Sequence, residues 1–108
     1  MAAESKATWE KAIHHPSASA TEIHQYARRL LTQGKKDEAL AIWQLNQKMH
    51  GNDWPVNVGL ARGYSAVGKY KDALKYAKLA ADQAPDEGNK KVLRDGIAKL
   101  EKGQDMNQ

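Results

Sequence analysis

The sequence repeats itself with a period of 34 residues, and this repeat constrains the fold more than any other feature. Shifting residues 20–53 by 34 positions onto residues 54–87 superposes seven identical pairs without a gap. The pairs are Ala27 with Ala61, Arg28 with Arg62, Gly34 with Gly68, Lys35 with Lys69, Ala39 with Ala73, Leu40 with Leu74 and Leu45 with Leu79. A period of this size is typical of chains that stack one supersecondary unit on the next. We therefore expect residues 1–108 to form a single helical-repeat domain.

Each unit is predicted to be two helices joined by a glycine turn. Gly34 and Gly68 stand where the first helix of each unit should end, and glycine takes up a positive φ there without a steric penalty. Apolar residues at three-and-four spacing predict the second helices at residues 36–50 and 70–84. Pro85 stops the second of these.

The starts of the first helices carry their own signals. Ser19 with Glu22 three residues later is a capping box, which predicts a helix start just ahead of an apolar face. In unit two the carboxylate of Asp53 is expected to cap the helix, and Pro55 is tolerated in its first turn. The repeats are accordingly placed at residues 20–53 and 54–87.

Small and large residues alternate in a way that predicts the core. Short side chains let two helices of one unit approach closely, and large ones then fill the gaps between units. The small positions are Ala27, Ala39, Ala61, Ala73 and Ala80. The expected fillers are Tyr26, Leu30, Trp43, Leu60, Tyr64 and Tyr70.

Two further helices are expected to cover the ends of the stack, since terminal repeats otherwise expose apolar faces. Residues 5–15 form the first, with Trp9 and Ile13 spaced to touch unit one. Residues 89–103 form the second, an amphipathic capping helix. Its apolar stripe is Val92, Leu93, Ile97 and Leu100.

Unit two carries a leucine, a small residue, a tyrosine, a glycine turn, a second tyrosine, two alanines and a proline at fixed offsets. These residues are Leu60, Ala61, Tyr64, Gly68, Tyr70, Ala73, Ala80 and Pro85. The pattern resembles the tetratricopeptide repeat. Unit one departs from it, with Lys36, Asn46 and Gly51 where tyrosine, alanine and proline are expected. The resemblance implies an all-α, right-handed solenoid of helical hairpins, with two full repeats between the flanking helices.

Residues 17–107 also resemble the C-terminal repeat tail of a family of bacterial envelope proteins of the Bacteroidetes, which carry an N-terminal domain of unknown function. The resemblance is carried by residues 54–70, 84–87 and 89–91. The start of this chain has no basic segment leading into an apolar one, so we expect no secretory signal in these residues. If the chain is excised from such a parent, the resemblance implies a periplasmic or envelope-associated location.

The tetratricopeptide resemblance also implies a concave surface lined by the first helices, whose outward positions contact a peptide. Carried onto this chain, the groove positions are Thr21, His24, Gln25, Arg28, Val58, Arg62, Ser65, Lys91 and Arg94. Arg28 and Arg62 occupy the same place in successive units and are expected side by side. Paired guanidiniums suit a carboxylate or an acidic peptide. The alternative is that both are solvated or pair with nearby Glu and Asp side chains.

The remaining patterns argue against other chemistries. The four histidines lack the spacing of metal ligands, and the chain has no cysteine, nucleophile with a base, or phosphate loop, so we expect no metal, no cofactor and no catalysis. The net charge of +4 is interspersed, which does not predict nucleic-acid binding, and no apolar run is long enough to span a membrane. The predicted function is a non-catalytic protein-protein interaction module, with oligomeric state and partner left open. The alternative is an accessory structural domain that stabilises or positions the N-terminal part of a longer exported protein.

Overall fold

The computed structural model describes residues 19–108, and within this range the chain forms five α-helices and no strands. The helices are α2 (Ala20–Thr32), α3 (Lys36–His50), α4 (Trp54–Ala66), α5 (Tyr70–Gln83) and α6 (Glu87–Glu101). The predicted all-α class is confirmed for these residues. The helix predicted at residues 5–15, with Trp9 and Ile13, lies outside them.

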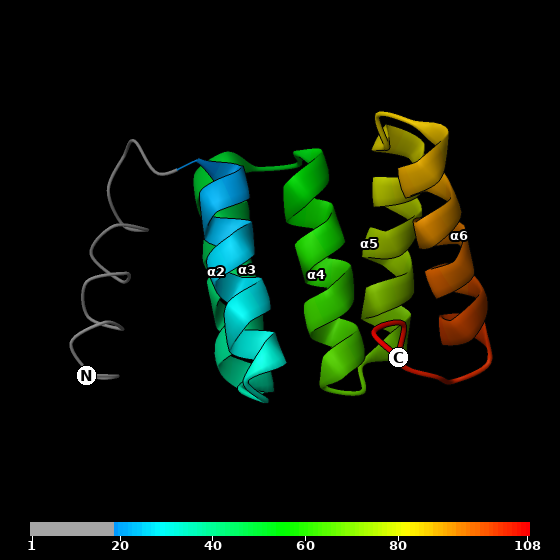
Figure 1. Ribbon diagram of the computed structural model, residues 1–108, viewed down its shortest axis with the longest axis horizontal. Helices are drawn as coiled ribbons and strands as arrows, with labels where there is room; N and C mark the ends of the chain where they lie inside the picture. The colour runs from blue at the N-terminus through cyan, green and yellow to red at the C-terminus, as the bar shows by residue number, and fades with distance from the viewer. Residues whose placement is uncertain (1–18) are drawn as a thin grey trace.

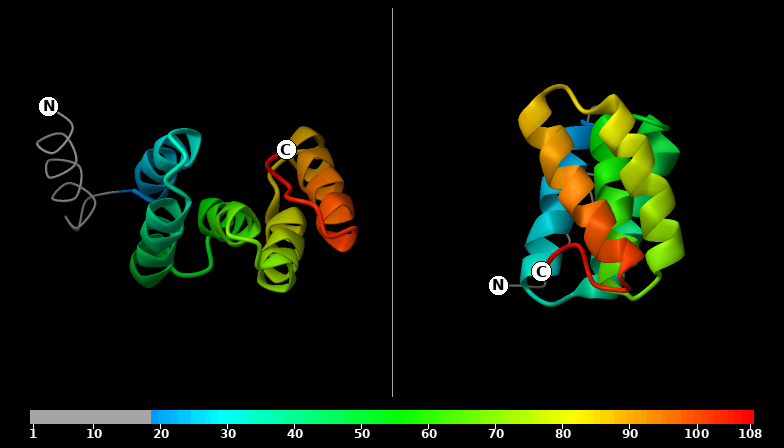
Figure 2. Two further views of the ribbon diagram at one scale, coloured as in Figure 1. Left: turned by 90° about the horizontal axis from the view of Figure 1, so that it is seen from below. Right: turned by 90° about the vertical axis from the view of Figure 1, so that its right-hand side faces the viewer.

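Consecutive helices pack side by side, and α2 also packs against α4 (Figure 1). Viewed along the helices, α3 and α5 lie on one side of the molecule, α2 and α6 lie on the other, and α4 lies between them (Figure 2, left). The side of the molecule formed by α2, α4 and α6 is called the concave face below.

The helix ends follow the local signals of the sequence. At the start of α2, Glu22 N donates to Ser19 Oγ at 3.1 Å and Ser19 N donates to Glu22 Oε1 at 3.3 Å, which is the predicted capping box. Gly34 and Gly68 have φ of 81° and 84°, so both turns use the left-handed conformation that glycine adopts at no cost. The two hairpins therefore close in the same way.

The start of α4 differs from the prediction. Asp53 is the N-cap residue, but its side chain makes no capping hydrogen bond. The polar contacts here come instead from the buried amide of Asn57, whose Nδ2 donates to Asn52 Oδ1 at 2.8 Å and to Gln83 Oε1 at 2.7 Å. This amide ties the loop before α4 to the end of α5.

The boundaries of α5 and α6 also differ slightly from the predicted ones. Helix α5 ends at Gln83, one residue before the predicted end. Helix α6 begins at Glu87, two residues before the predicted start, because Asp86 Oδ1 accepts from Asn89 N at 2.8 Å and caps the helix there.

The first core cluster includes Trp43 of α3, whose side chain is fully buried against α4. Its indole lies against two glycines of α4, where no side chain stands in the way. A Cβ added at Gly63 would lie 2.8 Å from Trp43 Cε3, and one added at Gly59 would overlap the indole ring. The large side chain of α3 thus fits into a gap that the glycines of α4 leave open.

Gly59→Ala should lower the free energy of unfolding by about 2 kcal/mol. The added methyl group overlaps the fully buried Trp43 deeply, so we expect a cost of about 3 kcal/mol, at the upper end of the usual range for overpacking, against about 1 kcal/mol gained in helix propensity. Gly88→Ala is the matched control, since its Cβ would meet only Asp86 Oδ1 at 3.4 Å. Urea unfolding should show Gly88→Ala unchanged or up to about 1 kcal/mol more stable. Equal effects at the two glycines would contradict this packing.

The second core cluster joins α4, α5 and α6 through small residues. Its buried members are Val58, Ala61, Ala73, Ala77, Ala80, Leu93, Leu100 and Met106. The predicted stripe of the capping helix is corrected at one position. Val92 is 52 % exposed, because the buried face of α6 follows Leu93, Gly96 and Leu100 and places residue 92 outside it.

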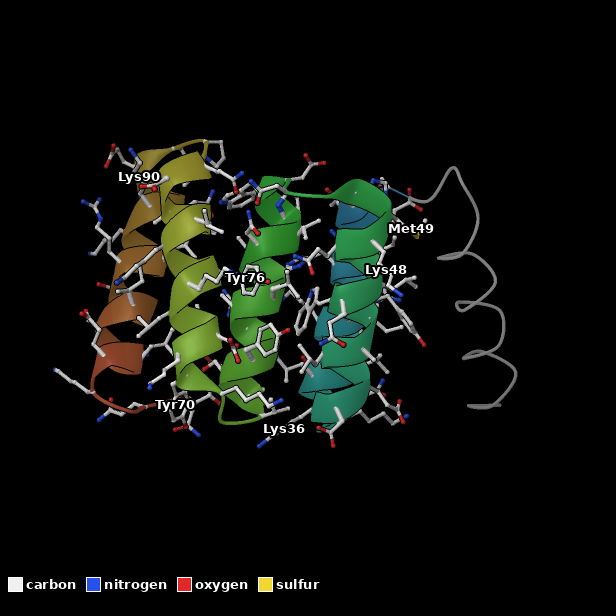
Figure 3. The ribbon with its side chains drawn as sticks, turned by 180° about the vertical axis from the view of Figure 1, so that it is seen from behind. Lys36, Lys48, Met49, Tyr70, Tyr76 and Lys90 are labelled. Atoms are coloured by element: carbon white, nitrogen blue, oxygen red, sulfur yellow. The ribbon has the colours of Figure 1, made fainter. Side chains whose placement is uncertain are left out.

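A polar seam on the side away from the concave face joins the two clusters. The rings of Tyr64 and Tyr76 stack at 5.7 Å with an interplanar angle of 8°. Gln44 Nε2 donates to Tyr64 Oη at 3.3 Å, and Gln47 Nε2 donates to Tyr76 Oη at 3.4 Å. Figure 3 shows Tyr76 on this face, where α3 and α5 lie in front. Helix α3 thereby reaches across to both helices of the second hairpin.

Candidate functional site

The residues after α6 turn back into the concave face. Gly103, with φ of 72°, lies where α6 ends, and the chain then runs toward α4 (Figure 2, left). Met106 is 7 % exposed and belongs to the second core cluster. Residues 104–108, called the tail below, therefore occupy part of the face that the sequence predicts as a peptide groove.

The tail is held by hydrogen bonds to two predicted groove residues of α4. Ser65 Oγ donates to Asp105 Oδ1 at 2.6 Å and accepts from Met106 N at 2.8 Å. Asn107 Nδ2 donates to the carbonyl oxygen of Arg62 at 3.0 Å, and Arg62 Nη1 donates to Asn107 Oδ1 at 3.3 Å. Lys99 Nζ also contacts the carbonyl oxygen of Gln108. Main-chain and side-chain groups of the tail thus both form hydrogen bonds with the helices.

A pocket of about 330 Å³ remains open beside the tail. It is lined by Arg28, Leu31, Thr32, Lys36, Arg62, Ala66, Asp105, Asn107 and Gln108. Three of these are cationic, from α2, α3 and α4, whereas Asp105 is the single acidic residue in this lining. Positive charge from three helices therefore converges on one hollow.

Arg62 is the least solvated of these cations. Its Nε is buried and has no hydrogen-bond partner among the described residues. Burial first, and then the charge of Arg28, lower the pKa of the Arg62 guanidinium, while Asp105 acts in the opposite direction. A partly desolvated cation whose hydrogen bonds are incomplete favours the approach of an anion.

Asp105 remains a carboxylate at neutral pH. Burial alone raises its pKa, but the hydrogen bonds from Ser65 and Asn107 and the charge of Lys36 outweigh burial and lower the pKa below its usual value. The pocket thus already accommodates one negative charge, which comes from the chain itself.

His24, predicted as a groove residue, instead supports the core. Its Nδ1 accepts a hydrogen bond from Trp43 Nε1 at 2.9 Å, and the two ring centroids lie 5.7 Å apart. Burial, followed by the charges of Arg28 and Arg62, lowers the pKa of His24 from its ordinary value of 6.5 to about 4. The imidazole is therefore neutral at pH 7, as an acceptor at Nδ1 must be.

The other predicted groove residues lie in different surroundings. Thr21 and Gln25 are exposed on α2. Val58 is 8 % exposed and packs in the second core cluster, so its side chain is not presented to a ligand. Lys91 and Arg94 are exposed on α6, where Arg94 Nη2 lies 3.3 Å from Glu87 Oε2. Neither of these two cations lines the pocket beside the tail.

The structure brings Arg28 and Arg62 to one pocket. Lys36 and Asp105 line the same pocket and are not among the predicted groove residues. One signal of the tail is present in the sequence. Met106 is the single large apolar residue after Leu100, and it follows the turn residue Gly103. An apolar side chain shortly after a glycine turn indicates a segment that packs back on the helices.

No family model, curated protein or solved structure matches this chain. Among residues 19–108, no helix has both the length and the apolar character required to cross a membrane. In the same range, no three histidine, aspartate or glutamate side chains gather in a way that would hold a metal ion.

Proposed function

We propose that this chain is a non-catalytic binding module of the tetratricopeptide type, which holds an acidic segment of another protein on its concave face. The observation that carries the proposal is the pocket where Arg28, Lys36 and Arg62 converge. The gap-free repeat of 34 residues and the matching glycine turns support the family assignment.

An acidic segment satisfies the electrostatic needs of this pocket better than a neutral one. The Arg62 guanidinium donates to the amide of Asn107 and lines the open pocket with Arg28 and Lys36, so a carboxylate that enters the pocket is attracted by all three cations. Arg28 is exposed, and its long side chain can adjust to a second carboxylate of the same segment. A segment with two acidic residues therefore matches the cations of successive repeats.

A fluorescence anisotropy titration tests this proposal. The probe is a fluorescein-labelled peptide, Gly-Asp-Glu-Asp-Glu-Gly, and its control is the amide counterpart, Gly-Asn-Gln-Asn-Gln-Gly. Arg28→Gln combined with Lys36→Gln should weaken binding of the acidic peptide about tenfold, since two exposed charge-assisted contacts are lost. The amide peptide should bind neither protein.

Arg29→Gln combined with Lys78→Gln removes the same charge from exposed residues that do not line the pocket. This control should bind the acidic peptide like the wild type, apart from a small effect of net charge. If all three proteins bind equally, the attraction is non-specific and the pocket is not the site. If the wild type binds no acidic peptide, the accessory structural domain becomes the favoured function.

A further inference from the structure

The tail contacts the concave face in the way that a bound peptide contacts a receptor. Three consecutive residues each use a different feature of the helices. The carboxylate of Asp105 meets the Ser65 hydroxyl, the side chain of Met106 enters the second core cluster, and the amide of Asn107 meets both the backbone and the side chain of Arg62. The three side chains of this segment are, in chain order, acidic, apolar and amide.

The slot for Met106 is shaped by a glycine. A Cβ added at Gly96 would lie 2.8 Å from Met106 Cε and 3.4 Å from its Cβ, so the side chain lies directly on the backbone of α6. Leu93 and Leu100 belong to the same buried cluster. A long, unbranched side chain fits such a slot because it can follow a flat helix surface, whereas a branched one is wider near the backbone.

The closure of α6 requires none of residues 105–108. Helix α6 ends at Glu101, and its last turn is closed by hydrogen bonds from Lys102 N, Gly103 N and Gln104 N to carbonyl oxygens of α6. The partners of the tail on α4 lie 40 or more positions earlier in the chain. A short segment that follows a glycine turn and bonds to a distant helix is joined to the domain as a tethered peptide is joined to its receptor.

We infer that the tail is an internal ligand, and that the site formed by Arg62, Ser65 and Gly96 recognises an Asp-Met-Asn segment from a partner chain as well. The inference rests on the proposed function in locating partner binding on the concave face. It goes further by naming the residue types of the partner segment. It also identifies the tail as the occupant that this segment must displace. Since Asp105 lines the same pocket as Arg28 and Lys36, the tail and an acidic partner compete for one surface.

The test uses the full chain with Asp105→Gly, Met106→Gly and Asn107→Gly combined, which removes the contacts and keeps the length. The probe is the labelled peptide Gln-Asp-Met-Asn-Gln, measured by fluorescence anisotropy. It should bind the triple variant at least about tenfold more tightly than the wild type, whose tethered tail competes at an effective concentration of about millimolar. The peptide Gln-Asn-Met-Asp-Gln has the same composition in a different order, and should bind the variant at least about tenfold more weakly than the probe, since its carboxylate no longer meets Ser65.

Three results would overturn the inference. One is equal binding of the probe to the wild type and the variant. Another is no binding to a variant that keeps the wild-type far-UV circular dichroism and a cooperative melt. The last is a variant that loses its cooperative melt and does not regain it when the probe is added, because the tail would then be part of the core. Recovery of the melt by the added peptide supports the inference. Failure of the acidic peptide of the previous subsection would leave this readout unaffected, so the two proposals fail separately.

Discussion

Trp43→Ala should lower the free energy of unfolding by about 4 kcal/mol. The indole is fully buried and fills the gap between α3 and the glycines of α4, so its removal leaves a cavity that the rigid helix backbones cannot close. The hydrogen bond from Trp43 to His24 is lost as well. Urea unfolding followed by far-UV circular dichroism measures the change.

Two further variants separate the cavity from the hydrogen bond. Trp43→Phe keeps a ring in the gap but has no donor for His24 Nδ1, and we expect a loss of about 2 kcal/mol. Val92→Ala shortens an apolar side chain that is 52 % exposed and should change stability by less than about 0.5 kcal/mol. A Trp43→Ala protein as stable as the Val92→Ala protein would rule out the described packing of α3 on α4.

Acidification should destabilise the wild-type domain between pH 6.5 and about pH 4, by about 3 kcal/mol through His24 alone. In this window the unfolded chain binds a proton at residue 24 that the folded chain, with its lowered pKa, does not bind. The contribution of His24 is therefore fully present at pH 7 and is lost as the pH falls from 6.5 toward 4. The gap between these two pKa values corresponds to about 3 kcal/mol.

His24→Gln is the variant that isolates this effect. The Gln side-chain oxygen can accept the hydrogen bond from Trp43 but does not titrate, so the variant should lose less stability than the wild type between pH 7 and pH 4. The contribution of Asp105 to stability is lost at lower pH than that of His24. Its folded pKa lies below the usual 3.8, so its carboxylate stops stabilising the fold only as the pH falls below that value. The midpoint of urea unfolding, measured at pH 7, 5 and 4, gives the pH dependence of stability for the wild type and for His24→Gln. Parallel curves for the two proteins would show that His24 is not buried as a neutral acceptor.

Local signals in the sequence predicted the helices of residues 19–108 well. The capping box of Ser19 and Glu22 and the glycines at 34 and 68 act within a few residues of the chain, so no knowledge of distant contacts was needed. The identity of Trp43 as a core residue also followed, since its position is set by the helical period.

Features that depend on distant partners were not predicted. Asn46 stands where the repeat pattern expects alanine, and only the structure shows that its fully buried amide donates to the carbonyl oxygen of Ala20 at 3.1 Å, at the start of α2. The contact between Ser65 and Asp105 spans 40 positions, so no local pattern around Asp105 identifies its partner. The pocket residues Arg28 and Arg62 were found because the repeat itself relates them, whereas Asp105 lies outside the repeats.

Helix α4 belongs to both core clusters, and this has a consequence for how the domain opens. Val56 and Leu60 face the first cluster, Val58 and Ala61 face the second, and eight of its 13 residues are buried. Separation of the first hairpin exposes one side of α4 to water, and separation of α5 and α6 exposes the other. Backbone amides of α4 should therefore exchange with solvent only on global unfolding, whereas those of α2 and α6, the first and last of the described helices, should exchange through smaller openings.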